Sequence, residues 1–144
     1  MGLRRDAVVG TCIAAVVIAV AVMAGCSSEP EQPALDGTSW KLTAWAESSP
    51  IPADVTITAT FADGKVSGNS GVNTYGGTYE SDTSGAFSAG PLASTMMAGP
   101  EEAMKAETAY LRRLDAAESY AITDSTLVLK DADGKDSLTF EAGD

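Results

Sequence analysis

The sequence contains no histidine and only two cysteines, Cys12 and Cys26, in 144 residues. Cys12 lies inside an apolar N-terminal run, so the chain beyond Cys26 has no thiol. Without imidazole or thiolate, this part cannot build Ser-His-Asp or Cys-His nucleophilic sites, imidazole or thiolate metal centres, or an internal disulfide. Carboxylates, hydroxyls, amides and amines are left to do chemistry, and we expect no metal and no cofactor.

Positive charge is also scarce. From Cys26 onward the chain has 19 Asp and Glu residues against seven Lys and Arg, a formal charge of −12. An acidic surface repels phosphate backbones and anionic headgroups, so nucleic acid is not an expected partner. The length fits one domain, and the sequence shows no internal repeat.

The N-terminus has the pattern of an export signal. Arg4 and Arg5 precede Ala7–Gly25, a run without charge that ends directly before Cys26. A basic start, an apolar stretch and a small-residue exit are typical of a secretory signal, and the cysteine makes it resemble a bacterial lipoprotein signal. We therefore expect residues 1–25 to be cleaved and Cys26 to be acylated. The protein would then lie outside the cytoplasm, lipid-anchored to the cell membrane, or to the outer membrane if the organism has one. The alternative is an uncleaved membrane helix.

The remaining chain reads as a short tether, residues 26–34, and one domain, residues 35–144. Period-two alternation and turn residues predict an α+β fold dominated by antiparallel sheet. The predicted strands are 39–45, 55–61, 65–67, 78–80, 86–88, 119–123, 126–130 and 137–140, and the predicted helix is 101–117.

The helix carries an acidic residue on its apolar face. Pro100 suits a helix start, and Glu101 and Glu102 favour its positive end. Glu107 falls in the middle of the stripe expected to face the core, so it must be hydrogen-bonded, paired or protonated. A structural acceptor is the favoured role, and a carboxylate hydrolase centred on Glu107 is the alternative.

Two loops imitate ligand-binding motifs. Residues 71–78 have the glycine spacing of a phosphate-binding loop, but Gly77 stands where that loop needs lysine and a strand is predicted to follow. Positive φ angles at a corner explain its glycines, Asn69 and Asn73 better. Residues 131–136 lack the glycine position of a calcium loop and predict a hairpin turn.

Several short runs occur in a specific order: LDGTSWKL at 35–42, VSGNSGVNTYGGTY at 66–79, PLASTMMA at 91–98, MKAE at 104–107 and LVL at 127–129, with Phe140 near the end. This order resembles the META domain family of heat-inducible HslJ-type lipoproteins over about residues 35–142. Many members have a cysteine at each of two positions, which are Val72 and Gly99 here. Since both are absent together, we expect the two positions to lie close in space, with apolar contact around Val72.

The resemblance implies a β-rich half-barrel of about eight strands with one packed helix. It implies no established enzymatic reaction, and links the family to envelope stress and antibiotic tolerance. We therefore expect a non-enzyme that binds another envelope component. The family-signature and possible binding residues are Gly71, Asn73, Tyr75, Gly77, Thr95 and Glu107. The alternative is a binding module for a small apolar ligand, lined by Trp40, Trp45 and Phe61.

Overall fold

The computed structural model describes residues 31–143; the predicted signal peptide and Cys26 lie outside the described residues. Within them, eight strands and one helix follow the predicted order. The elements are β1 (Thr38–Trp45), β2 (Thr58–Ala62), β3 (Lys65–Asn69), β4 (Thr74–Ser81), β5 (Phe87–Ser94), α1 (Glu101–Ala116), β6 (Ser119–Thr123), β7 (Thr126–Lys130) and β8 (Asp136–Ala142). The predicted α+β class is confirmed.

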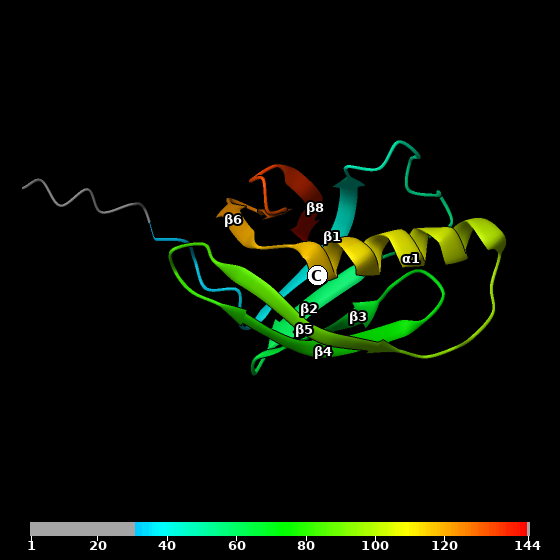
Figure 1. Ribbon diagram of the computed structural model, residues 1–144, viewed down its shortest axis with the longest axis horizontal. Helices are drawn as coiled ribbons and strands as arrows, with labels where there is room; N and C mark the ends of the chain where they lie inside the picture. The colour runs from blue at the N-terminus through cyan, green and yellow to red at the C-terminus, as the bar shows by residue number, and fades with distance from the viewer. Residues whose placement is uncertain (1–30, 144) are drawn as a thin grey trace, which may run out of the picture.

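The strands form a single antiparallel sheet in the order β5-β4-β3-β2-β1-β8-β7-β6. The sheet curls into a half-barrel, and α1 lies across its open side (Figure 1). The two edge strands approach each other at one end, where Ala86 pairs with Ser119 and the Phe87 N–H donates to the Glu118 carbonyl at 3.0 Å. Toward its other end, β5 packs against α1 instead.

The core fills the space between the sheet and the helix. Alternation along β2 and the residue before it buries Ile57, Ala59 and Phe61 on one face, as period-two reading predicts. The helix contributes Tyr110 and Leu114, both fully buried. The largest fully buried apolar side chains are Tyr110, Phe61, Phe140, Leu35, Ile57, Leu114, Leu127, Leu129 and Leu138.

Two tight turns follow directly from their residues. Asp63 and Gly64 have φ of 53° and 72°, the left-handed pair that a two-residue hairpin requires between β2 and β3. In the β7–β8 turn, the Asp131 carboxylate accepts from the Asp133 and Lys135 N–H groups, each at 3.0 Å. The predicted hairpin at residues 131–136 is therefore confirmed.

Three strand boundaries differ from the prediction by three residues or more. β2 begins at Thr58, three residues later than expected, while β4 begins at Thr74, four residues earlier. β5 extends to Ser94 although it contains Pro91. A proline cannot donate to a sheet ladder, but β5 is an edge strand and has a neighbour on one side only. Local propensity hid these residues because their pairing depends on long-range contacts.

The start of the described chain docks on the domain. The Gln32 N–H donates to the Thr83 carbonyl at 2.6 Å, and the Gln32 side-chain oxygen accepts from the Ile122 N–H at 3.0 Å. The Tyr120 hydroxyl lies 3.1 Å from the Pro33 carbonyl. The single helix within residues 31–143, α1, is not long and apolar enough to cross a membrane.

Candidate functional site

A buried carboxylate joins the helix to the turn between β3 and β4. Glu107, 7% exposed, accepts hydrogen bonds at Oε2 from the Asn73 N–H at 2.8 Å and the Val72 N–H at 3.2 Å. The Ser70 hydroxyl lies 2.8 Å from the same oxygen, and Asn73 Nδ2 lies 2.8 Å from Oε1. Of the three states expected for Glu107, hydrogen-bonded, paired or protonated, the structure shows the hydrogen-bonded one.

These bonds keep Glu107 charged. Burial by itself raises the pKa of the carboxyl, but the hydrogen bonds from Asn73, Ser70 and the Val72 N–H outweigh burial, so the pKa lies below its ordinary value. The Ser70 hydroxyl is also 2.9 Å from the Asn73 carbonyl. The Ser70 hydroxyl has one proton to donate, and it donates to the Glu107 carboxylate because a hydrogen bond to a charged acceptor is stronger than one to a carbonyl.

Asn73 connects this carboxylate to the segment that leads into α1. Its Oδ1 accepts from the Met97 N–H at 2.7 Å and from the Thr95 hydroxyl at 2.8 Å, and its Nδ2 also donates to the Met97 carbonyl at 3.2 Å. We call Ser70, Asn73, Thr95 and Glu107 the Glu107 cluster. It ties together the β3–β4 turn, the helix and the β5–α1 connection.

The corner itself depends on Gly71. Its φ is +127°, which side-chain-bearing residues rarely adopt. The backbone angle and not lack of space demands glycine, because a Cβ there would be in ordinary contact with the Ala103 carbonyl and a Val55 methyl at 3.4 Å. Asn69 supports the turn by accepting from the Gly71 N–H at 2.8 Å. The expectation of positive φ is thus right for Gly71 and wrong for Gly76, Gly77, Asn69 and Asn73. The two asparagines act through hydrogen bonds instead.

Val72 and Gly99 are in contact, as the missing cysteine pair predicts. A Cβ built on Gly99 would lie 2.7 and 2.8 Å from the two Val72 methyl carbons and 3.4 Å from its Cβ. The valine side chain therefore occupies the place that a side chain at position 99 would need. Apolar contact holds the β3–β4 turn against the segment before α1.

The two remaining signature residues are structural. The Tyr75 hydroxyl donates to the Thr58 carbonyl at 2.9 Å. It also lies 2.6 Å from the Tyr110 hydroxyl. Because Tyr75 has already given its one proton, Tyr110 must be the donor in this pair. Burial raises the pKa of both phenols well above the ordinary range. Gly77 permits close approach of β5, because a Cβ there would lie 2.6 Å from the Pro91 carbonyl.

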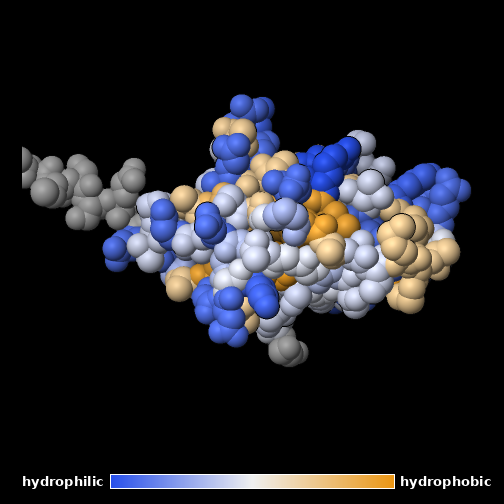
Figure 2. Space-filling model, turned by 60° about the horizontal axis from the view of Figure 1, so that its bottom comes forward, coloured by the Kyte–Doolittle hydropathy of each residue, from blue (hydrophilic) through white to orange (hydrophobic). Residues whose placement is uncertain are grey.

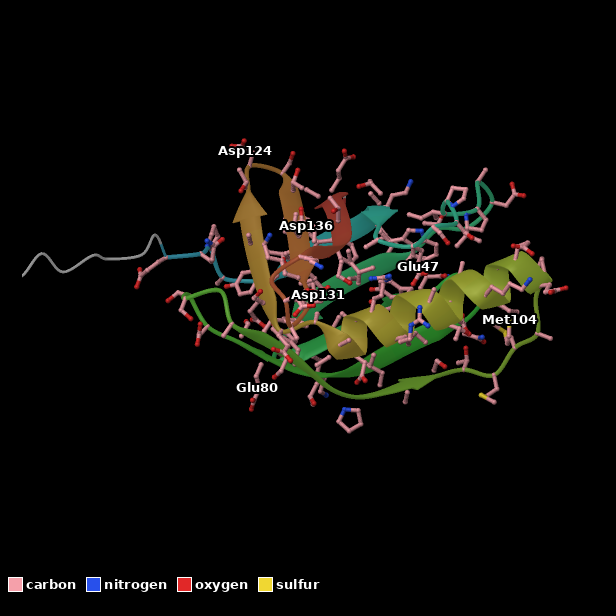
Figure 3. All side chains as sticks on the ribbon, turned by 45° about the horizontal axis from the view of Figure 1, so that its top comes forward. Glu47, Glu80, Met104, Asp124, Asp131 and Asp136 are labelled. Atoms are coloured by element: carbon pink, nitrogen blue, oxygen red, sulfur yellow. The ribbon has the colours of Figure 1, made fainter. Side chains whose placement is uncertain are left out.

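The aromatic residues proposed to line a ligand site are mostly core. Trp40 is 5% exposed and Phe61 is fully buried, so neither reaches an open cavity. Half-buried Trp45 borders a small pocket of about 210 Å³ between the β1–β2 connection and α1. Glu47, in the same connection (Figure 3), pairs with Arg112 at 2.7 Å and Arg113 at 2.8 Å.

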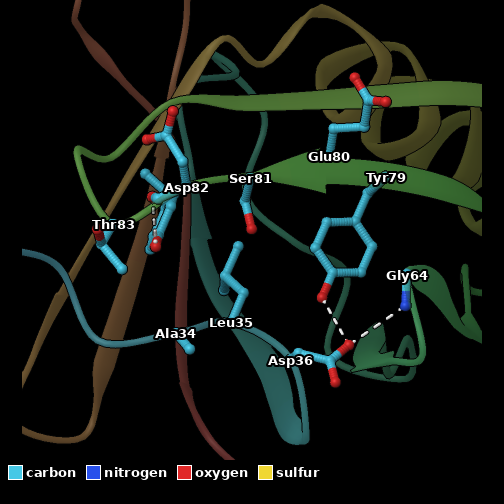
Figure 4. A pocket seen from close by; sticks show the side chains of 10 residues that line it. Ala34, Leu35, Asp36, Gly64, Tyr79, Glu80, Ser81, Asp82 and Thr83 are labelled. Carbon is cyan, nitrogen blue, oxygen red and sulfur yellow. Dashed lines mark hydrogen bonds between the residues drawn. The ribbon is translucent and has the colours of Figure 1, made fainter.

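A larger pocket of about 470 Å³ lies at the end where the described chain begins (Figure 4). The Asp36 carboxylate accepts there from the Tyr79 hydroxyl at 3.1 Å and from the Gly64 N–H at 3.2 Å. Burial, followed by this carboxylate, raises the pKa of Tyr79 to about 12. The Asp36 carboxylate thus ties the residues just before β1 to β4 and to the β2–β3 turn. Nowhere in residues 31–143 do three or more Asp or Glu side chains lie close enough together to hold a metal ion.

A scan against protein families matches the META domain over residues 33–144. The chain belongs to the META domain family. Thus the polar cluster and the Val72–Gly99 contact are features of a META domain. A search of curated proteins found no match.

Solved structures agree with this assignment. A protein from Burkholderia xenovorans, determined by NMR, is 30% identical with a TM-score of 0.66, and the match covers 80% of this chain and 90% of that chain. A DUF4847 family protein from Bacteroides vulgatus shares the fold, with a TM-score of 0.54 and 16% identity over 74% of this chain and 93% of that chain.

The sequence singled out Asn73, Thr95 and Glu107, and the structure brings these three together. It places Tyr75 and Gly77 elsewhere, in β4. Sequence reasoning missed Ser70, whose position in a glycine-rich corner gave no sign that its hydroxyl faces the helix. It also missed that Met96 and Met97 are 95% and 57% exposed to solvent, because apolar residues next to a predicted helix are ordinarily buried in the core.

Proposed function

We propose that this META-domain protein is a non-enzymatic, lipid-anchored envelope protein that binds another envelope component. In that role it would support envelope integrity or tolerance of stress and antibiotics. The anchor is the lipid on Cys26, and the domain works outside the cytoplasm.

The use of Glu107 carries the proposal. Among the acidic residues, Glu107 is the one that its position in the sequence marks as a candidate for catalysis. Its Oε2 accepts hydrogen bonds from Ser70, Val72 and Asn73, and its Oε1 accepts one from the Asn73 side chain. A general acid at neutral pH needs a raised pKa, whereas the pKa of Glu107 is lowered. Its environment therefore favours a clamp that shapes a binding surface over a hydrolase.

Crosslinking in intact cells tests the proposal. The full chain should fractionate with membranes and give a discrete crosslinked complex with another envelope component. Cys26→Ala should release the protein from the membrane and lower the yield of that complex. Retention of Cys26→Ala at the membrane would favour the uncleaved helix instead of the lipid. Absence of any complex from the wild-type chain would count against a binding role.

Binding of a small apolar ligand is the second candidate, and Trp45 is the observation that favours it. The pocket beside Trp45 is also lined by Pro50, Pro52 and Ala106, but its volume of about 210 Å³ is below the usual range of roughly 300–1,000 Å³ for ligand sites. Thermal shift against lipids and hydrophobic antibiotics decides: a saturable shift that Trp45→Ala removes would support this candidate over the first.

A further inference from the structure

The connection between β5 and α1 exposes two adjacent methionines. Met96 is 95% exposed and Met97 is 57% exposed, and within residues 31–143 they are the large apolar side chains that stand in solvent. Figure 2 shows pale orange atoms gathered at the end of the molecule where Figure 1 places this connection. Adjacent exposed apolar side chains mark interaction sites, and methionine adapts well to a partner surface.

The backbone that carries them is fixed. Met97 is bonded to the Asn73 side chain through both its N–H, at 2.7 Å, and its carbonyl, at 3.2 Å. On one side the Thr95 N–H donates to the Thr74 carbonyl at 3.0 Å, and on the other Gly99 packs against Val72. A segment ordered before binding loses less freedom when a partner docks, so the cluster prepares this surface.

We propose that Met96 and Met97 form the docking site for a protein partner that offers an apolar pocket bordered by Lys or Arg side chains. The inference rests on the proposed function and identifies the surface and the partner chemistry that this function would use.

Charge around the methionines favours a basic border on the partner. Glu101 and Glu102 begin the helix directly after the connection, with side chains 80% and 75% exposed. Lys105 pairs with both, at 2.8 and 3.3 Å, which leaves a net negative charge. Basic groups complement this surface, whereas a second copy of the chain would bring the same acidic residues and anionic headgroups would be repelled.

The site also faces away from the predicted anchor. Gln32, at the start of the described chain, is hydrogen-bonded to Thr83. Thr83 is close in sequence to Ala86, which pairs with Ser119 just after α1 ends. The chain therefore enters the domain near the C-terminal end of α1. The methionines precede the N-terminal end of α1, and Figure 1 shows the two ends of the molecule far apart. A helix of 16 residues spans about 24 Å at 1.5 Å per residue. A lipid anchor at Cys26 would therefore leave this surface at the far end of the domain.

A photo-crosslinking amino acid in place of Met96, in the full chain in intact cells, tests this. Ala132, exposed in the β7–β8 turn, is the matched control position. This turn lies near the C-terminal end of α1, where the Glu118 N–H donates to the Lys130 carbonyl, and so at the opposite end of the helix from the methionines. We expect position 96 to give one adduct with an envelope protein, at a segment flanked by Lys or Arg, and position 132 to give none. With a chemical crosslinker, Met96→Gln with Met97→Gln should lower the yield of the complex roughly tenfold. Ala132→Gln should leave it unchanged, and Glu101→Gln with Glu102→Gln should lower it.

The outcomes separate the two proposals. A complex that forms equally well with Met96→Gln and Met97→Gln would overturn the docking site and leave the proposed function standing. Adducts at position 96 with lipid, or with a second copy of the chain, would overturn the choice of occupant. Loss of every complex, including that of the wild-type chain, would overturn both. Because both side chains are exposed, the glutamine variants should melt like the wild type, and position 96 crosslinking decides if they do not.

Discussion

At the scale of single residues, Glu107 performs a task usually left to backbone pairing. The β3–β4 turn offers the N–H groups of Val72 and Asn73 toward the helix, and the carboxylate accepts both. A buried acceptor that is bonded on every side is costly to remove, since its donors would be left without partners.

Replacement of Glu107 should therefore destabilise the fold. Glu107→Ala should lower the free energy of unfolding by about 1–3 kcal/mol. Glu107→Gln, of nearly the same shape, should also be destabilising because its NH₂ group would face the donors that now bond to the carboxylate. Urea unfolding of the domain measures both. A wild-type midpoint in Glu107→Gln would contradict the role of the negative charge.

The same carboxylate predicts a dependence on acid. Because the folded-state pKa of Glu107 is lowered, its contribution is present above the unfolded pKa and is lost as pH falls through the folded one. The wild-type chain should thus lose stability more steeply than Glu107→Gln below about pH 4–5. Melting temperatures across this range check it, and parallel curves for the two proteins would argue against it.

Position 99 tolerates no side chain while Val72 is present. Gly99→Ala would place a carbon 2.7 Å from a valine methyl, and valine is stiff about χ1. The expected cost is about 1–3 kcal/mol, and Val72→Ala in the same chain should recover much of it. A double-mutant cycle by chemical denaturation measures the coupling, and additive effects would contradict the contact.

The pair also suits a disulfide. The Cβ positions of residues 72 and 99 are 3.4 Å apart, close to the roughly 3.5–4.5 Å of natural disulfides. Val72→Cys with Gly99→Cys should oxidise to an intramolecular bridge, visible as a mass loss and as a melting temperature that falls on reduction. A pair that stays reduced under oxidising conditions would count against this geometry.

Some of these residue roles were predictable and others were not. The carboxylate on an apolar stripe announces a buried acceptor, so Glu107 followed from periodicity. The importance of Asn73 as the link to Met97 did not, because its partners lie 24 and 34 residues away and only the folded sheet brings them together. The role of Ser70 was not predictable either, because its partner Glu107 lies 37 residues away in the sequence.

At the scale of elements, the helix is joined to the sheet by phenols as well as by Glu107. Tyr110 of α1 meets Tyr75 of β4 edge to face, with ring centroids 5.5 Å apart. Tyr79 of β4 holds the residues just before β1 through its hydrogen bond to Asp36. All three phenols have raised pKa values because of burial, and that of Tyr79 is about 12.

These phenols predict unfolding in alkali. A group whose folded pKa is raised stabilises the fold fully below its unfolded pKa, here about 10, and that stability is lost as pH rises toward the folded value. All four tyrosines are buried, so the domain should form little tyrosinate until it unfolds cooperatively near or above the Tyr79 pKa of about 12. Tyrosinate absorbance and circular dichroism followed together check this. Ionisation of all four tyrosines well before the loss of structure would contradict it.

Element order was predictable and boundaries were less so. Turn residues such as Asp63 and Gly64 mark hairpins through backbone geometry that a sequence displays. The reach of β4 and β5 depends on neighbours. Pro91 is tolerated because β5 is an edge strand, whereas Gly77 of β4, which lies between β3 and β5, is needed for the close approach of β5.

At the scale of the whole molecule, the curled sheet separates two ends with different surroundings. One end receives the chain at Gln32, and the other presents Met96 and Met97. The fold class and helix could be inferred from periodicity. The opposition of the ends could not, because it depends on how α1 crosses the sheet.

Closure of the sheet has a consequence for the nascent chain. Open sheet edges recruit other strands and seed aggregates, and a newly made chain is exposed to this hazard until it folds. Here both edge strands are blunted by different means. Pro91 interrupts β5, while β6 is covered where the Ile122 N–H donates to Gln32 and where Ser119 pairs with Ala86. Gln32, which lies within the predicted tether, thus covers part of the β6 edge and shields it from other strands once the domain has formed.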